Sequence, residues 1–295
     1  MKNVCRMILL FVGVVSALCV TAGAAKYLVI DLSDAALTNE CQISSLDAEP
    51  EGGWPNECKT SKLVMRRIEP GTFMMGHSDF WRNYPSNRVT LTRPFYIGVF
   101  EVTQKQWEFV MGSAPEGYGG YTRGDSLPVA CVSYDMIRGK TKGSKWPDSR
   151  DVDGDSFIGR LREYTGLSFD LPTEAQWEYS CRAGTETDFS YGKRPNTAYM
   201  NSLSPRARPV GERKPNLWGL YDMHGNVSEW ALDWFAKQVP SGKDPVGSSS
   251  GSYRVHRGGH RGQDYYGCSV AQRYLFDPGV MSPDTGLRLA LVLDE

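Results

Sequence analysis

Residues 216–230 read Asn-Leu-Trp-Gly-Leu-Tyr-Asp-Met-His-Gly-Asn-Val-Ser-Glu-Trp, and this stretch says most about the fold. It mixes bulky aromatic side chains with Gly219, Gly225 and the carboxylates Asp222 and Glu229, and it follows neither the helical nor the strand period. A run of this kind is typical of a loop whose shape is fixed by ligands rather than by a stripe of core residues.

The composition of the whole chain fits such a loop-rich protein. The 295 residues could form one large domain or two small ones, and an apolar fraction of 40% allows a sizeable core. The 31 glycines and 17 prolines predict many turns and little long regular structure. A net charge of -1 gives no general case for binding nucleic acid or an anionic membrane surface.

The N-terminus has the pattern of a secretory signal peptide. Lys2 and Arg6 precede an almost wholly apolar stretch at 7–20, and Ala-Gly-Ala-Ala at 22–25 supplies the small residues that a signal peptidase needs. A membrane anchor is the alternative, but the apolar stretch is short for a bilayer span. We therefore predict that residues 1–25 are removed and that the chain, with no membrane span after cleavage, is secreted or periplasmic.

Export changes the interpretation of the cysteines. After cleavage the chain keeps Cys41, Cys58, Cys131, Cys181 and Cys268, and an odd number leaves at least one thiol unpaired within the chain. Cys41 and Cys58 close a short loop that contains glycine and proline, so they are the first choice for a disulfide. No Cys-x-x-C pattern or cysteine-histidine cluster indicates zinc.

Local signals predict a mixture of strands and short helices. Helix starts are expected after Thr103 and Thr173, because each is followed three residues later by glutamine in a capping-box pattern. Ser133 is expected to cap a further helix, and another is expected at 155–164. Strands are expected at 27–32, 63–68, 89–91, 95–100, 253–257 and 287–293. Residues 26–60 then form an N-terminal extension with one strand, ahead of a main domain at 61–293.

Seven separated stretches of the main domain form an ordered set of motifs. They are Pro-Gly-Thr-Phe-Met-Met-Gly (70–76), Phe-Tyr-Ile-Gly-Val-Phe-Glu-Val-Thr-Gln-Lys-Gln-Trp (95–107), Pro-Val-Ala-Cys-Val-Ser-Tyr (128–134), Leu-Pro-Thr-Glu-Ala-Gln-Trp-Glu-Tyr (171–179), Gly-Leu-Tyr-Asp-Met-His-Gly-Asn-Val-Ser-Glu-Trp (219–230), Arg-Val-His-Arg-Gly-Gly (254–259) and Gly-Leu-Arg-Leu-Ala (286–290). In this order they resemble the sulfatase-modifying factor family, that is, the formylglycine-generating enzyme domain. The resemblance implies a single loop-rich α+β domain with a C-type-lectin-like fold.

The resemblance also implies a reaction, for which this chain is incomplete. Active members oxidise a sulfatase cysteine to formylglycine with oxygen, using two cysteines spaced Gly-Gly-Ser-x-x-Cys-x-x-x-x-Cys that bind copper(I) through soft sulfur. Here Cys268 falls on the second cysteine when counted from Gly259, but about three residues off when counted back from Ala-Gln-Arg at 271–273, so the register is open. In the first register Gln263 stands in place of the first cysteine, and His260 replaces the serine. Cys268 is thus the only catalytic candidate, and copper is doubtful because an amide oxygen is a poor copper(I) ligand.

Three further residues bear on the chemistry of this site. Ser228 replaces a tryptophan that lies near the active groove in active members of the family. His260 could act as a metal ligand beside Cys268, but an exposed or hydrogen-bonded loop histidine is the preferred interpretation. His256 precedes His260 by four residues, a spacing that would suit a shared metal ion on one face of a helix. The intervening Gly-Gly disfavours a helix, so this spacing is weak evidence for metal.

A structural calcium site is also implied by the resemblance. The positions carried over are the side chains of Asp222 and Glu229 and the backbone carbonyls of Gly225 and Val227. This is an all-oxygen set, which calcium prefers. The alternative is that the two carboxylates are surface groups without an ion.

Two functions remain open at this stage. The first is a non-oxidising binding or accessory protein whose ligand is a protein, such as a sulfatase, or a carbohydrate. The alternative is a copper-dependent oxidase that generates formylglycine with Cys268 and an unusual partner. A family relative that oxidises a small sulfur compound at iron is disfavoured, because its three-histidine motif sits in an added helical domain for which this chain has no room.

Overall fold

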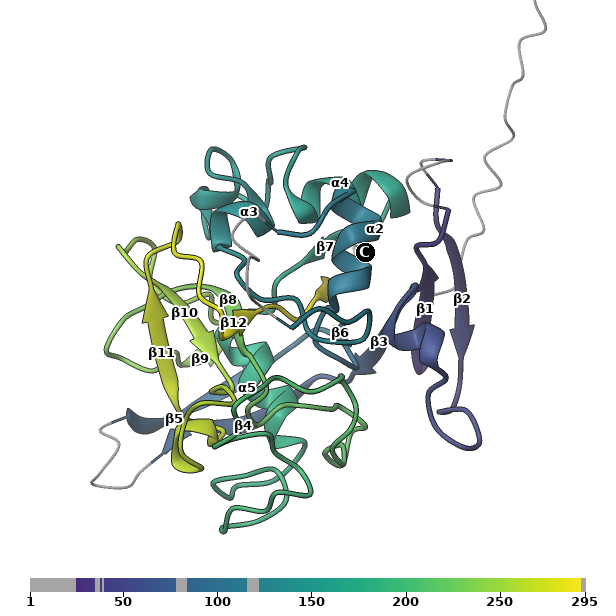
Figure 1. The fold of residues 1–295 in the computed structure, drawn as a ribbon. Helices are drawn as coiled ribbons and strands as arrows, with labels where there is room; N and C mark the ends of the chain where they lie inside the picture. Colours follow the sequence, from purple (N-terminus) through teal and green to yellow (C-terminus); the bar gives the residue numbers. More distant parts are fainter. Residues whose placement is uncertain (1–24, 35–37, 39, 78–83, 116–121, 293–295) are drawn as a thin grey trace, which may run out of the picture.

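The protein folds into three sheets joined by short helices and long ordered loops (Figure 1). The computed structural model describes residues 25–34, 38, 40–77, 84–115 and 122–292, so residues 1–24 of the predicted signal peptide lie outside the described residues. Its helices are α2 (Gln104–Met111), α3 (Tyr134–Arg138), α4 (Phe157–Thr165) and α5 (Glu174–Arg182), with 3₁₀ turns η1 (Asn56–Lys59), η2 (Gly143–Lys145) and η3 (Tyr266–Cys268). Within this described part, no helix is both long and apolar enough to span a bilayer. The predicted loop-rich α+β single domain is confirmed.

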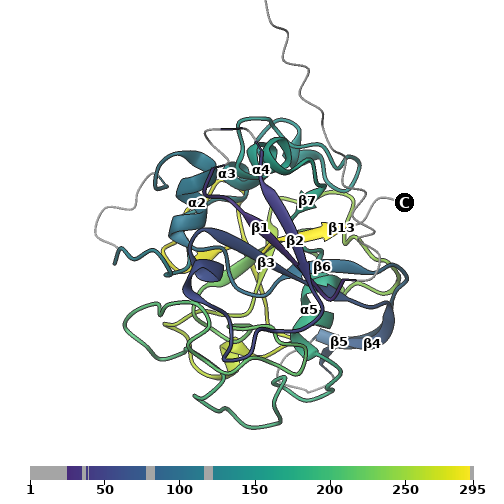
Figure 2. The same cartoon turned by 90° about the vertical axis from the view of Figure 1, so that its right-hand side faces the viewer.

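The largest sheet is antiparallel and contains both the first and the last strand of the described residues (Figure 2). In spatial order its strands are β2 (Gln42–Leu46), β1 (Tyr27–Asp31), β3 (Lys62–Ile68), β6 (Phe95–Gly98), β13 (Ala290–Val292) and β7 (Phe169–Asp170). The N-terminal extension therefore holds two strands instead of the one predicted. β2 was missed because it is an exposed edge strand in which only Ile43 is half-buried, so its sequence carries no apolar alternation.

The two faces of this sheet cover different core clusters. Along β1, Leu28 and Ile30 point into one cluster and Tyr27 and Val29 into another, as the strand period requires. Cys41 packs with the first cluster, whereas Cys58 in η1 belongs to the second. The predicted Cys41–Cys58 disulfide is therefore wrong, because the sheet separates the two side chains, and all five cysteines of the described residues are free thiols.

The two smaller sheets come from the rest of the chain. One has the order β11 (Arg273–Phe276), β10 (Arg254–Arg257), β8 (Ser228–Trp234) and β12 (Thr285–Gly286), and the other has the order β4 (Gly71–His77), β5 (Tyr84–Leu91) and β9 (Gly242–Lys243). β8 begins inside the 216–230 segment, where no strand was expected. Its residues are buried on both faces up to Asp233, so its sequence shows no alternation that could have marked a strand.

The helix starts confirm the local signals. Thr103 Oγ1 accepts from the backbone N–H of Gln106, and Gln106 Oε1 accepts from the N–H of Thr103; Thr173 and Gln176 repeat the same reciprocal bonds at α5. Helix α5 then buries Trp177 and Cys181 in one apolar cluster, where the free thiol behaves as a small apolar side chain.

Candidate functional site

The loop at 258–268 brings together the two positions that the copper chemistry of the family would need. It follows β10 and turns at Gly259, whose φ of 68° lies in the left-handed region. A methyl group on Gly259 would lie 2.5 Å from the carbonyl oxygen of Gly267 and 2.8 Å from both Cys268 Sγ and Gln263 Oε1. Gln263 and Cys268 thus flank the same point of the backbone, which supports the register counted from the glycine pair.

Cys268 is a buried, neutral thiol. Its side chain is fully shielded from solvent and packs with Phe189 and Met200, and its Sγ donates to the carbonyl oxygen of His260 at 3.7 Å. Burial raises the pKa of Cys268 to about 12, and the nearby Asp264 charge acts in the same direction. The thiolate, which is the form that binds metal or attacks a substrate, is therefore scarce at neutral pH.

Gln263 closes the turn of the loop instead of presenting a ligand. Its Oε1 accepts from the backbone N–H of His260 at 3.1 Å, and its own N–H donates to the His260 carbonyl at 3.0 Å. Among the described residues, no group of three or more histidine, cysteine, aspartate or glutamate side chains could hold a metal ion. The residues at this loop do not fit the two-thiolate copper site of the family.

His260 faces Asp284 and not the thiol. Its Nδ1 lies 3.8 Å from Asp284 Oδ2 and accepts from the backbone N–H of Gly262 at 3.2 Å, so only its carbonyl touches Cys268. Burial lowers the pKa of His260, and the Asp284 charge opposes that shift in part. The interpretation of His260 as a hydrogen-bonded loop histidine is confirmed.

Ser228, at the start of β8, fills the place of the bulky aromatic residue with a small polar one. Its Oγ donates to the Asp284 carbonyl at 3.0 Å and lies 3.0 Å from both Thr285 Oγ1 and His256 Nδ1. His256 stacks on Phe276 with ring centroids 4.5 Å apart, and burial lowers its pKa to about 3. His256 is therefore a neutral core residue that links β10 to β8.

A cavity of about 300 Å³ opens beside this loop. Arg261 forms part of its wall, and its Nη2 lies 2.9 Å from Asp284 Oδ1 while its Nη1 donates to the Pro205 carbonyl. The cavity is lined by two arginines, three prolines, one leucine and otherwise small or polar side chains: Gln104, Thr122, Leu127, Pro128, Ala130, Pro205, Arg206, Ala207, Arg261 and Pro283. Sequence reasoning missed Arg261, Asp284 and Pro283, because no local pattern signals that distant loops meet.

His224 ties the 216–230 segment to the 258–268 loop. Its Nδ1 donates to the carbonyl oxygen of Cys268 at 2.8 Å, and its Nε2 accepts from Ser190, with Ser190 Oγ at 2.9 Å. Burial lowers the pKa of His224 to about 4, so the ring is neutral and holds a single tautomer.

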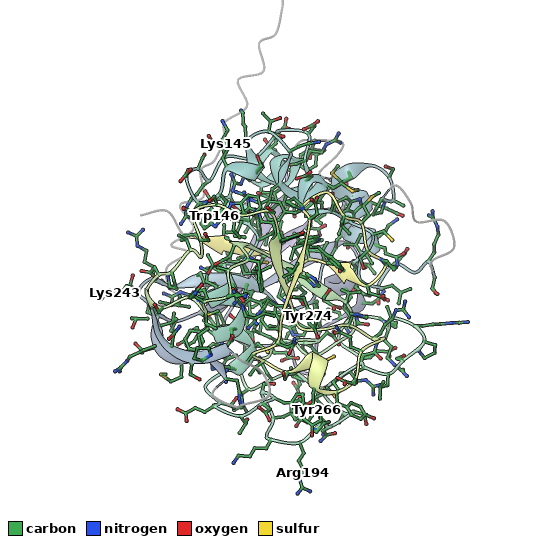
Figure 3. The ribbon with its side chains drawn as sticks, turned by 90° about the vertical axis from the view of Figure 1, so that its left-hand side faces the viewer. Lys145, Trp146, Arg194, Lys243, Tyr266 and Tyr274 are labelled. Atoms are coloured by element: carbon green, nitrogen blue, oxygen red, sulfur yellow. The ribbon has the colours of Figure 1, made fainter. Side chains whose placement is uncertain are left out.

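Two tyrosines mark the end of the 258–268 loop and the strand that follows it. Figure 3 shows Tyr266 in the lower part of the molecule and Tyr274 nearer the centre. Tyr274 donates to the Gly267 carbonyl at 2.8 Å.

The predicted calcium ligands lie in the interior beside a protein cation. Glu229 accepts from Arg288, with Oε1 2.7 Å from Nη2, and from the indole N–H of Trp177, which lies 2.6 Å from Oε2. Arg288 Nε lies within 3.1 Å of both Glu229 oxygens, so each oxygen already accepts two hydrogen bonds. Glu229 thus does not fit as a calcium ligand in this arrangement.

The other predicted ligands surround the same charge cluster. Asp222 Oδ2 accepts from the backbone N–H of Gly211 at 2.6 Å, and the N–H of Val227 donates to Glu101 at 3.0 Å. Gly225 donates its N–H to the Gly258 carbonyl, which joins it to the 258–268 loop. Burial raises the pKa of Asp222 to about 6, and the negative charge of Glu229 adds to the shift. Calcium at this place stays a prediction, resting on Asp222 and the two carbonyls.

Comparison with known proteins agrees with the motifs. A family model described as "Sulfatase-modifying factor enzyme 1-like domain" matches residues 53–293. The chaperone protein LppX of Paenibacillus barcinonensis is 29% identical over 79% of this chain and 90% of its own length, and the formylglycine-generating enzyme of Mus musculus is 28% identical over 80% of this chain and 76% of its own. The structure of Treponema denticola variable protein 1 is similar with a TM-score of 0.62 and 28% identity, over 79% of this chain and 96% of that one. With motifs, fold and family model in agreement, the chain belongs to the sulfatase-modifying factor family.

Proposed function

We propose that this protein is a non-oxidising binding or accessory member of its family, acting through the 258–268 loop and the cavity beside it. The observation that carries the proposal is the pair flanking Gly259, where a turn-closing amide, Gln263, accompanies a single buried thiol, Cys268. A copper(I) site of the family type needs two thiolates, and Cys268 is neither paired nor ionised at neutral pH.

The intact surroundings of the loop support a binding role. His224 holds the loop through a buried hydrogen bond to the Cys268 carbonyl, and Asp284 holds it through an ion pair with Arg261 while accepting from Ser228. The arginines and prolines of the cavity suit a protein segment or a carbohydrate as ligand. A sulfatase is one such partner, since the family model is described by sulfatase modification.

We further propose that the protein acts outside the cytoplasm. The support is the charged start, apolar stretch and small residues at 1–25. Expression of the full chain with its own N-terminus, followed by intact mass measurement, tests this. A mature protein that begins at or near Lys26 is expected, and recovery of the uncleaved chain from the cytoplasm would contradict it.

The oxidation chemistry is tested directly with a peptide. Purified protein is incubated with copper(I), oxygen and a Cys-x-Pro-x-Arg peptide, and the mass of the peptide is followed. We expect no loss of mass from the peptide cysteine. A mass loss that disappears in Cys268→Ala would overturn the proposal and establish the oxidase alternative.

Binding is tested with the same peptide, labelled with a fluorophore and followed by anisotropy. Pro283→Arg places a long side chain in the cavity, and Pro245→Arg is the matched control at another surface. Binding that only Pro283→Arg weakens would support a protein ligand at the cavity. Binding that both variants leave unchanged would place the ligand elsewhere.

A further inference from the structure

A second cavity, of about 350 Å³, lies away from the 258–268 loop and shares no lining residue with the cavity beside that loop. It is formed by the start of β1, the end of β3, helix α5 and the first turn of the 216–230 segment; Figure 2 shows β1, β3 and α5 from this side. Its chemistry comes from six side chains: Lys26, Arg66, Arg67, Glu69, Tyr179 and Trp218.

The cavity has an excess of positive charge. Arg67 forms an ion pair with Glu69 at 2.5 Å, so Lys26 and Arg66 remain as two further cations. Among the residues that the structure describes, neither Lys26 nor Arg66 lies in an ion pair with a carboxylate. Lys26 is exposed and Arg66 is half-buried, so an anion that enters the cavity meets two cations that no carboxylate of the described residues already pairs.

Arg66 is held in place by uncharged groups. Its Nε donates to the Trp218 carbonyl at 3.2 Å, and its Nη1 donates to the carbonyls of Lys26 and Arg67 at 3.3 and 3.0 Å. Its guanidinium also lies over the Tyr27 ring, 5.0 Å from the centroid. These contacts fix the orientation without neutralising the charge, which is the arrangement that favours a carboxylate or sulfate group.

An aromatic wall completes the cavity. Tyr179 and Trp218 are both partly exposed and meet edge to face, with ring centroids 4.9 Å apart at 72°. Asn216 fixes this wall, because its Oδ1 accepts from the Trp218 N–H at 3.0 Å and its Nδ2 donates to the Ser180 carbonyl of α5 at 2.8 Å. A rigid indole and phenol pair presents an apolar surface with polar edges, which matches the C–H face and the hydroxyl edge of a sugar ring.

We propose that this cavity binds a sugar ring that carries an anionic group, either a carboxylate or a sulfate. The anionic group lies against Arg66 and Lys26, and the ring packs on Trp218 and Tyr179. The volume falls within the range of small-molecule sites and suits a ligand of one or two rings. Occupancy is independent of any chemistry at Cys268, because the two sites share no lining residue.

The test is binding of three small sugars to the purified protein, measured by calorimetry and by saturation-transfer NMR. The probes are methyl β-D-glucuronide, glucose 6-sulfate and the neutral methyl β-D-glucoside. We expect at least one anionic sugar to bind about tenfold more tightly than the glucoside, the size of one charged hydrogen bond. Which anionic sugar binds more tightly identifies the group that the site prefers.

Paired variants locate the binding. Lys26→Gln and Trp218→Ala are each expected to weaken binding by about tenfold. Their matched controls, Lys145→Gln and Tyr253→Ala, change an exposed lysine (Figure 3) and an exposed aromatic residue outside both cavities and are expected to bind as the wild type. All four variants are checked by thermal melting, so that a loss of folding is separated from a loss of binding.

The proposal is overturned if neither anionic sugar binds at millimolar concentration or if the glucoside binds equally well. It is also overturned if well-folded Lys26→Gln and Trp218→Ala both bind with wild-type affinity. Arg66→Lys keeps the charge but loses the planar guanidinium, and it is expected to bind the anionic sugars more weakly.

Discussion

The guanidinium of Arg288 holds the carboxylate of Glu229 in the interior of the molecule, with Nη2 2.7 Å from Oε1. Trp177 of α5 donates to the other oxygen of the same carboxylate. This one buried carboxylate on the inner strand β8 thereby connects helix α5 with the C-terminal segment. Three of the sequence motifs, at 171–179, 219–230 and 286–290, meet at it.

This pair predicts a large loss of stability when one partner is removed. Arg288→Met leaves the Glu229 carboxylate buried without its cation, and we expect the free energy of unfolding to fall by about 3 kcal/mol. Urea unfolding measures this. Arg208→Met, which breaks an exposed pair with Glu212, is the matched control and should change stability little. Equal losses in the two variants would contradict the anchoring role.

Removal of calcium is expected to lower the melting temperature. Asp222 and the carbonyls of Gly225 and Val227 would supply the oxygen ligands, whereas the oxygens of Glu229 already accept hydrogen bonds from Arg288 and Trp177. Differential scanning calorimetry with and without a chelator measures this, and Asp222→Asn should abolish the difference. A melting temperature that the chelator leaves unchanged would contradict a structural calcium site.

Asp233 should contribute stability that is lost as pH rises from about 4 to about 7. Burial raises the pKa of Asp233 to about 7, and the neighbouring Glu174 charge adds to the shift. The folded protein then binds more protons than the unfolded chain between about pH 4 and pH 7, so the stabilisation present at low pH is lost as pH approaches and passes 7.

Asp233→Asn tests this pH dependence. It keeps an acceptor for the Glu174 N–H, which donates to Asp233 at 2.7 Å, and removes only the titration. From pH 6 to pH 8, the unfolding free energy of the wild type should fall relative to that of the variant. The neutral core histidines 224 and 256 contribute equally to both proteins. A difference that does not vary with pH would contradict the raised pKa.

Thiol labelling should follow burial. Without reductant, all five cysteines of the described residues should react with a maleimide in denaturant, because none is in a disulfide. In the folded protein Cys41, which is partly exposed, should react first, although burial raises its pKa to about 11. Cys268 should stay unlabelled, and peptide mass mapping identifies the sites. Rapid labelling of Cys268 would show an activated thiol and contradict its buried state.

A second thiol at the loop should create copper affinity. Gln263→Cys places a thiol beside Cys268 across Gly259, and we expect copper(I) to bind at least about tenfold more tightly than in the wild type, because soft sulfur is the preferred ligand. Competition against a chromogenic copper(I) chelator measures this. Gln272→Cys is the control, since it adds a thiol outside the 258–268 loop. A gain of equal size in both variants would show that any added thiol suffices.

The sequence by itself determined the local features and the family. The capping boxes at Thr103 and Thr173 were predictable because each depends on bonds between residues three apart, and the order of the motifs indicated the fold. The absence of a thiol at position 263 was also readable, since it needs only a residue identity at a fixed spacing.

The tertiary structure decided every relationship that spans a long stretch of chain. Cys41 and Cys58 are close in sequence, but opposite faces of one sheet separate them. The resemblance alone assigned Glu229 to calcium, whereas its partner Arg288 is 59 residues away, and no periodicity or spacing reports that pairing. Short-range hydrogen bonds and strand alternation are encoded in neighbouring residues, whereas the charge and burial of a side chain depend on which distant segments the fold brings against it.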